Sequence, residues 1–163
     1  MATVTATVRR DANTVLGKGD GNNLKTHGVR TIELAPSASG TIIDFKLRVS
    51  LMDRIDLASS IFYDDLATSG APTLDVGAYP VDANFTADDD CFNDGLTLAT
   101  AVTWATRAPF VKDAANAGKQ VWEYITGATK DTGGFADIKG VVRDAATITN
   151  TGTIAVDLKT YID

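Results

Sequence analysis

A strict alternation of apolar and charged side chains over residues 41–49 constrains the fold more than any other feature of the sequence. The apolar members are Ile43, Phe45, Leu47 and Val49, and the charged members are Asp44, Lys46 and Arg48. Because successive side chains of a strand point to opposite faces, this pattern is typical of a strand with one buried and one solvated face. The stretch therefore predicts a sheet that covers a hydrophobic core on one side.

The same alternation recurs along the chain and predicts a series of short strands. In residues 54–63 the apolar side carries Ile55, Leu57, Ile61 and Tyr63. The other predicted strands are residues 73–79, 96–104, 120–125, 135–143 and 153–161, with shorter candidates at 3–8 and 31–34. One short helix is expected at residues 111–117, where Gly118 ends it.

Residue usage agrees with a β-rich fold. The 163 residues include 19 Asp but 2 Glu, together with 22 Thr. Asp competes with the helical backbone for hydrogen bonds, and Thr suits a pleated surface. We therefore predict an all-β, two-sheet antiparallel sandwich with at most one short helix, and prefer a jelly roll. An immunoglobulin-like sandwich ranks second, because the single cysteine cannot form the pair that marks immunoglobulin domains.

The chain divides into an N-terminal segment, residues 1–30, and one sandwich domain, residues 31–163. The segment is locally basic in a chain whose net charge is −6. Its basic residues are Arg9, Arg10, Lys18, Lys25 and Arg30. Two interpretations remain open: an arm that orders against a partner protein, or a solvated tail.

The overall charge and hydropathy exclude several classes of partner. A pI near 4.6 disfavours binding to a phosphate backbone, so no nucleic-acid partner is expected. No apolar run approaches the roughly 18 residues of a membrane-spanning helix, and the N-terminus does not have the pattern of a secretory signal. We therefore expect a protein that binds neither nucleic acid nor membrane.

No catalytic constellation is evident. His27 is the single histidine, expected in a loop beside Gly28, and no sequence feature nominates a nucleophile for it. Cys91 follows three aspartates, which would raise the thiol pKa, so it is expected to fill space in the interior. We predict that the protein is not an enzyme and needs no cofactor.

One acidic segment offers a weak metal candidate. Its carboxylates are Asp88, Asp89, Asp90 and Asp94. Clustered carboxylates can bind Ca²⁺, but the EF-hand pattern fails, because the twelfth position counted from Asp90 is Ala101. The alternative is a solvated loop whose aspartates cap turns. No metal site is predicted.

Four aromatic side chains leave a binding role open. These are Tyr79, Trp104, Trp122 and Tyr124. If exposed in a row they would form a platform for sugar stacking, whereas buried they would fill the core or a subunit interface.

Three segments resemble small virion proteins of tailed bacteriophages that decorate, or cement, the icosahedral head. They are residues 61–77, IFYDDLATSGAPTLDVG; residues 88–95, DDDCFNDG; and residues 118–124, GKQVWEY, followed by GGF at 133–135. The resemblance extends over roughly residues 41–144 and consists of turn motifs rather than a catalytic signature.

The resemblance implies a non-enzymatic virion protein on the capsid exterior, made in the host bacterial cytoplasm. Its partners would be the major capsid protein, whose subunits it would bridge, and itself, as a homotrimer. Alternatives are another virion component (head fibre base, neck or tail protein) or a carbohydrate-binding jelly-roll module.

Overall fold

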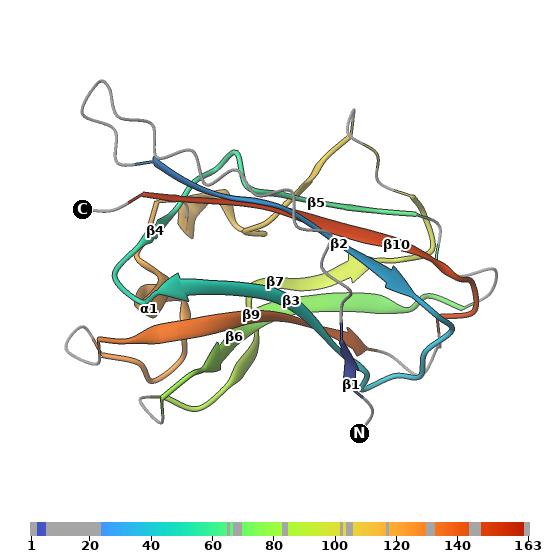
Figure 1. The fold of residues 1–163 in the computed structure, drawn as a ribbon, viewed down its shortest axis with the longest axis horizontal. Coiled ribbons are helices and arrows are strands. Elements are labelled where there is room, and N and C mark those ends of the chain that lie inside the picture. The colour runs from blue at the N-terminus through green and yellow to red at the C-terminus, as the bar shows by residue number, and fades with distance from the viewer. Residues whose placement is uncertain are drawn as a thin grey trace.

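Two stacked β-sheets form the fold in the computed structural model (Figure 1). The structure describes residues 3–5, 24–64, 66, 70–82, 85–101, 103, 106–116, 118–129, 133–143 and 148–161. The first sheet, sheet A, has the strand order β1-β3-β9-β6-β7. Its strands are β1 (Thr3–Thr5), β3 (Ile42–Ser50), β9 (Phe135–Arg143), β6 (Thr73–Pro80) and β7 (Asp88–Thr97). Sheet B has the order β2-β10-β5-β8, and β4 also pairs with β10. Its strands are β2 (Leu24–Leu34), β10 (Gly152–Tyr161), β5 (Ser60–Tyr63), β8 (Ala108–Pro109) and β4 (Arg54–Ile55).

The pairing pattern is that of a jelly roll. Strands β2, β3, β5 and β6 pair in antiparallel fashion with β10, β9, β8 and β7, respectively. This is the pairing of one long folded hairpin, first strand with last and second with second to last. Rolling that hairpin places β10 beside β5 and β9 beside β6, as observed. The prediction of an all-β, two-sheet sandwich is confirmed, and the strand order has the jelly-roll form.

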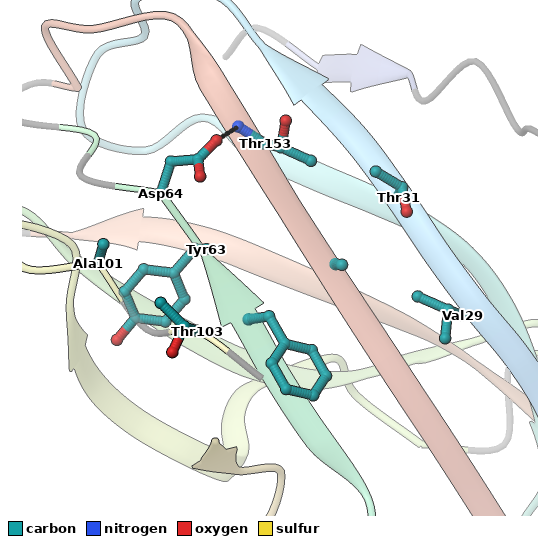
Figure 2. A pocket seen from close by; sticks show the side chains of 9 residues that line it. Val29, Thr31, Tyr63, Asp64, Ala101, Thr103 and Thr153 are labelled. Carbon is teal, nitrogen blue, oxygen red and sulfur yellow. Dashed lines mark hydrogen bonds between the residues drawn. The ribbon is translucent and has the colours of Figure 1, made fainter. Parts of the chain in front are cut away.

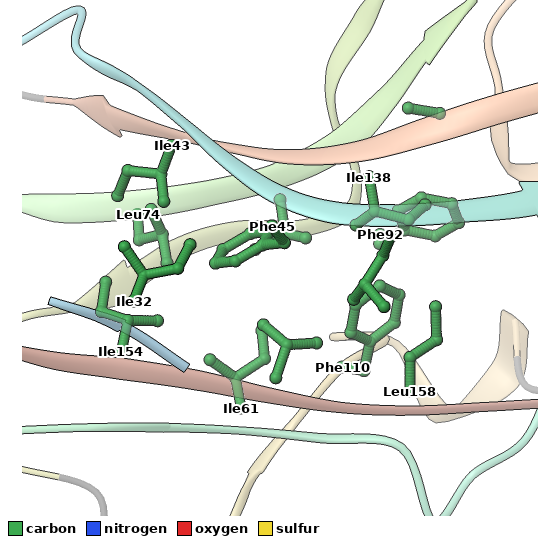
Figure 3. Packing of buried hydrophobic residues seen from close by; sticks show 14 of the residues in the cluster. Ile32, Ile43, Phe45, Ile61, Leu74, Phe92, Phe110, Ile138, Ile154 and Leu158 are labelled. Carbon is green, nitrogen blue, oxygen red and sulfur yellow. The ribbon is translucent and has the colours of Figure 1, made fainter. Parts of the chain in front are cut away.

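The core lies between the two sheets and contains the apolar rows that alternation predicted. Ile43 and Phe45 of β3 are 0% exposed, as are Leu74 of β6 and Ile154 of β10. Figure 3 shows these side chains meeting in one layer between the sheets, with Phe92 and Phe110 nearby, whose ring centroids are 5.2 Å apart. The alternation in residues 73–79, 135–143 and 153–161 is likewise confirmed as β6, β9 and β10.

Strand β3 keeps its alternation despite a bulge. Asp44 pairs with Lys139 but Leu47 with Ile138, so two extra residues are accommodated in β3. Lys46 takes a φ of 53°, which is unusual for a residue with a side chain. The Asp44 carboxylate accepts hydrogen bonds from the Lys46 amide, at 2.9 Å, and ammonium, at 2.6 Å. Because two residues are inserted, the inward and outward faces are preserved beyond the bulge.

Several predicted elements are wrong. The strand predicted at residues 96–104 lies earlier, in the acidic segment, as β7, and shares only residues 96 and 97 with the predicted range. Residues 120–125 form one helical turn, α1 (Val121–Tyr124), rather than a strand. The helix expected at 111–117 is a 3₁₀ turn at Ala114–Asn116. In addition, β2 begins at Leu24, so residues 24–30 belong to sheet B.

Leu57, which was predicted to face the core, instead faces solvent, with 70% of its surface exposed. Residues 54–63 are split by a turn in which the Asp56 carboxylate accepts the Ala58 amide at 2.7 Å. The Ser59 amide also bonds to the Asp56 carbonyl, at 2.9 Å. Such a turn interrupts the extended backbone, so alternation does not continue through it.

Candidate interaction surfaces

The outer face of sheet A carries a network of paired charges centred on Arg143. The Arg143 guanidinium donates to Asp75 at 2.8 Å and to Asp89 at 2.7 Å. Asp75 is 6% exposed and also accepts the Gly95 amide at 2.9 Å, while Asp89 accepts the Tyr79 hydroxyl. Strands β9, β6 and β7 are thereby tied together by charge-assisted hydrogen bonds.

The same face continues with pairs along β3 and β9. Arg48 donates two hydrogen bonds to Asp137, at 2.8 and 3.1 Å. The Lys139 ammonium lies 4.8 Å from the centre of the Tyr79 ring, a cation–π distance. Most charges of this face therefore have a partner within the chain.

The acidic segment is a strand whose carboxylates point to different partners. Asp88 accepts the Thr126 amide at 2.7 Å, Asp89 binds Arg143, and Asp94 lies 3.6 Å from the Lys112 ammonium. Among the residues that the structure describes, no group of three or more His, Cys, Asp or Glu side chains could hold a metal ion. The expected solvated loop is thus wrong, and the four carboxylates do not converge on one point.

Asp88 and Asp90 share one side of β7 and interact with each other. Burial raises the pKa of Asp88, but hydrogen bonds from Thr126 and Asp90 outweigh it and leave that pKa below its ordinary value. The hydrogen bond to Asp88, with some burial, raises the pKa of Asp90. With Arg143 and Thr126 these residues line an acidic hollow of about 410 Å³.

Cys91 contacts the core from β7 and is a free thiol. Burial, and then the negative charge of Asp88, raise its pKa well above the ordinary value. The sequence predicted a raised thiol pKa because of the neighbouring aspartates. The direction is the same in the structure, but burial is the larger cause. A thiol in these surroundings is a poor nucleophile.

His27 lies in strand β2 rather than in a loop. Its Nε2 is 2.9 Å from the Thr160 hydroxyl of β10, which in turn lies 3.4 Å from an Asp53 carboxylate oxygen. The hydroxyl stands between the imidazole and the carboxylate, whereas a catalytic triad places the histidine between nucleophile and acid. Thr160 is also 0% exposed, so no substrate could reach its hydroxyl.

The basic residues proposed for partner binding are described only in part. Arg9, Arg10 and Lys18 lie outside the described residues. Lys25 lies in β2 opposite Thr160, and Arg30 lies opposite Val156, on the side of β2 that faces sheet A. The Nε of Arg30 is buried and has no hydrogen-bond partner among the residues described.

Three of the four aromatic candidates can be placed, and they do not form an exposed row. The Trp122 indole, partly buried against the core, donates to the Gln120 side chain at 2.8 Å. The Tyr124 hydroxyl donates to the Asn116 carbonyl at 2.5 Å. Tyr79 is engaged with Asp89, and Trp104 lies outside the described residues. In the described part of the chain these rings contribute to packing rather than to a sugar platform.

The outer face of sheet B holds a groove that sequence reasoning missed (Figure 2). It has a volume of about 410 Å³ and is more apolar than polar. Its lining residues are Val29, Thr31, Phe62, Tyr63, Asp64, Ala101, Thr103, Thr153 and Ala155. They come from β2, β5, β10 and the stretch after β7, which lie far apart in sequence, so no local motif signals the groove.

Comparison with known proteins gives a match in fold but none in sequence family. No family model matches the chain, and no curated protein matches it. Among solved structures, a chain described as "Cyanophage Pam1 capsid asymmetric unit" superposes with a TM-score of 0.52 at 19% sequence identity. The match covers 96% of this chain and 95% of the other. At this identity it establishes a shared fold. Within the residues described, no helix is long and apolar enough to cross a membrane.

Proposed function

We propose that this chain is a non-enzymatic structural protein of a tailed-bacteriophage virion. It decorates the outer capsid and stabilises it by bridging subunits of the major capsid protein. The observation that carries the proposal is the end-to-end fold match with a chain from a phage capsid asymmetric unit. The sequence resemblance to head-decorating proteins points to the same role.

The surfaces of the molecule suit such a role. Jelly rolls serve in capsids and lectins, and their function depends on their surfaces rather than on the fold itself. The described residues place His27 against a buried threonine and Cys91 against the core, which favours a role without catalysis. A shell protein acts in many copies, so that modest affinity at each contact is multiplied by avidity.

The finer parts of the proposal concern partners. Self-association, as a homotrimer, would give each decorating unit several contacts with the capsid. The basic segment that contains Arg9, Arg10 and Lys18 would contact acidic surface on the capsid protein, since it is the most basic part of an acidic chain.

Copy number in the virion distinguishes the proposal from its alternatives. Quantitative mass spectrometry of virions of the phage that encodes this chain should find it in a fixed, high ratio to the major capsid protein. Labelling with antibodies against the chain should cover the head in electron micrographs. A few copies per particle, with label at one vertex or on the tail, would instead indicate a neck, fibre or tail component.

A separate experiment tests the N-terminal contact. The variant R9A/R10A should lose binding to heads from which the protein has been stripped, with an unchanged thermal unfolding curve. The matched control is Lys112→Ala, an exposed cation of the sandwich. Equal binding by both variants would remove the basic segment from the proposed interface.

A further inference from the structure

Strand β2 is an edge of sheet B, with β10 on one side of it. Both backbone groups of Thr153 in β10 point towards β5, since its carbonyl accepts the Asp64 amide at 3.1 Å and its amide donates to the Asp64 carboxylate at 2.8 Å (Figure 2). The next residue, Ile154, therefore bonds to β2, where it pairs with Ile32. Alternate residues of β2 bond to β10 in this way, and the residues between them direct their amides and carbonyls to the free edge. Those edge residues are Val29, Thr31 and Glu33.

This edge has the properties of a site for an added strand. No described residue forms a hydrogen bond with its backbone groups, and Thr31 and Glu33 are exposed. Residues 29–34 pair with β10 without a register shift, because the bulge of the strand lies before them, around Gly28. A regular edge of this kind can bind an extended segment through main-chain hydrogen bonds.

Arg30 is a cation without a counter-charge beside that edge. It lies opposite Val156, which is 0% exposed, so its side chain is on the side of β2 that faces sheet A. Its Nε is buried without a hydrogen-bond partner, and no described residue forms an ion pair with its guanidinium. An unpaired cation in such a place is costly, and a carboxylate on an added strand would remove the cost. Because Arg30 bonds to β10, it would face an added antiparallel strand at a non-hydrogen-bonded position, where opposite side chains approach most closely.

A second copy of β2 does not supply this carboxylate. The carboxylate of β2 belongs to Glu33, which lies on the other face of the sheet from Arg30 and accepts the Thr153 hydroxyl at 3.2 Å. An antiparallel pair of β2 strands would put Arg30, Ile32 and Leu34 of both copies on one face and both Glu33 carboxylates on the other. Self-pairing would thus bring two cations to the same face.

The acidic edge strand β7 is also unsuitable as the added strand. The Phe92 carbonyl of β7 accepts the Lys112 amide at 2.9 Å, so another segment of the chain already bonds to this strand. Its Asp89 carboxylate is paired with Arg143 at 2.7 Å. The observations therefore favour a carboxylate from a different protein.

We propose that the free edge of β2 accepts an extended segment of the major capsid protein as an antiparallel strand, with an Asp or Glu side chain of that segment paired with Arg30. Main-chain hydrogen bonds to Val29, Thr31 and Glu33 supply affinity, and the charge pair supplies specificity. An apolar side chain opposite Arg30 would leave the cation buried and unpaired, which selects against other strands. The inference rests on the proposed function and names a surface by which the chain holds a capsid subunit.

Binding to heads from which the protein has been stripped, measured by cosedimentation over a concentration series, tests the contact. Arg30→Met keeps an apolar stem and removes the charge, and Thr31→Pro removes an N–H of the free edge without removing a bond to β10. Each should weaken binding at least about tenfold. Two matched controls should bind like the wild type: Thr31→Val keeps the N–H, and Arg48→Met removes an exposed arginine of sheet A.

Two further measurements separate a binding role from a structural one. As a free protein, Arg30→Met should unfold at a temperature no lower than the wild type, because it removes a charge that has no partner there. The amides of Val29, Thr31 and Glu33 should exchange rapidly with deuterium in the free protein and slowly on the heads.

Four results would overturn the inference while wild-type binding to heads keeps the capsid role. The first is normal binding by both Arg30→Met and Thr31→Pro. The second is an Arg30→Met variant that loses stability together with binding. The third is slow exchange of the edge amides in the free protein, which would mean that the chain itself covers the edge. The fourth is protection that grows with the concentration of free protein, which would assign the edge to a second copy.

A wild type that does not bind stripped heads would overturn the capsid role and this contact together. Copy number in the particle tests that role separately.

Discussion

The two outer faces of the sandwich are built from similar strands but differ in what they leave available. On sheet A, Arg143, Asp75, Asp89 and Tyr79 form a continuous network in which each polar group has a partner within the chain. On sheet B, Phe62 and neighbouring small residues line an apolar groove. Charges that are already paired within the chain offer little to a partner, because a competing contact would leave one of them without its counter-charge. We infer that the paired charges of sheet A serve chiefly to hold β6, β7 and β9 together, whereas the residues described on the outer face of sheet B line a mostly apolar groove.

The largest effect is expected from Gly77→Ala, on the outer face of sheet A. A Cβ at this position would lie 1.9 Å from the Asp88 carbonyl oxygen, so β6 and β7 would have to separate. We expect a loss of about 3 kcal/mol in the free energy of unfolding, measured by urea denaturation. The control Thr31→Ala, on sheet B, should stay within about 0.5 kcal/mol of the wild type. An unchanged Gly77→Ala would show that β7 does not lie tightly against β6.

The next effect in size is that of Asp75→Ala, which removes the buried acceptor of the network. The Gly95 amide would lose its acceptor at a buried position, and Arg143 would keep only Asp89 of its two carboxylate partners. A cost of about 2 kcal/mol is expected, with self-association unaffected. Asp75→Asn keeps an acceptor for the Gly95 amide and should cost less. If Asp75→Ala left the midpoint of urea denaturation unchanged, the network around Arg143 would not be what holds these strands together.

The sequence predicted best what depends on neighbouring residues. The alternation of β3, β6, β9 and β10 is local, and it fixed both the strands and their buried faces. Strand β7 was missed because its aspartates suggest a loop, and the partners that let them lie on a sheet are remote in sequence: Arg143 is 54 positions from Asp89. A local sequence pattern therefore cannot reveal that Asp89 pairs with Arg143.

Two local sequence signals mark features of the fold that alternation alone does not predict. Gln120 precedes Glu123 by three positions, and the Glu123 carboxylate accepts the Gln120 amide at 2.7 Å, which is half of a capping box at the start of α1. Asp56 similarly marks the turn that exposes Leu57. The groove of sheet B had no such signal, because four separate segments line it.

Two tyrosines allow the faces to be compared by pH. Burial and the hydrogen bond to Asp89 both raise the pKa of Tyr79 on sheet A, whereas burial alone raises that of Tyr63 on sheet B. A raised pKa means that the fold favours the neutral phenol. The resulting stability is complete below about pH 10, the ordinary tyrosine pKa, and is lost as the pH rises through the folded value.

Absorbance of the phenolate during alkaline titration measures this difference. Tyr63→Phe should remove one tyrosine ionisation step from the titration curve, and Tyr79→Phe should remove another. The step lost in Tyr63→Phe should lie at the lower pH. Tyr124, whose pKa burial raises to about 12, is present in both variants and serves as an internal reference. Loss of the same step in both variants would mean that the Asp89 hydrogen bond does not distinguish the two faces.

The smallest effect is expected from the exposed end of the sheet A network, the pair Arg48–Asp137. Its two hydrogen bonds, at 2.8 and 3.1 Å, have the geometry of a strong pair, yet 55% of the Arg48 side chain and 30% of that of Asp137 are exposed. Water and salt screen such a pair, and ordering two long side chains costs entropy. The midpoint of urea denaturation for Asp137→Ala should therefore lie close to that of the wild type. Burial, rather than the number of ion pairs, would then explain why Asp75 matters and Asp137 does not. A loss as large as that of Asp75→Ala would mean instead that the whole charged face acts as one cooperative network.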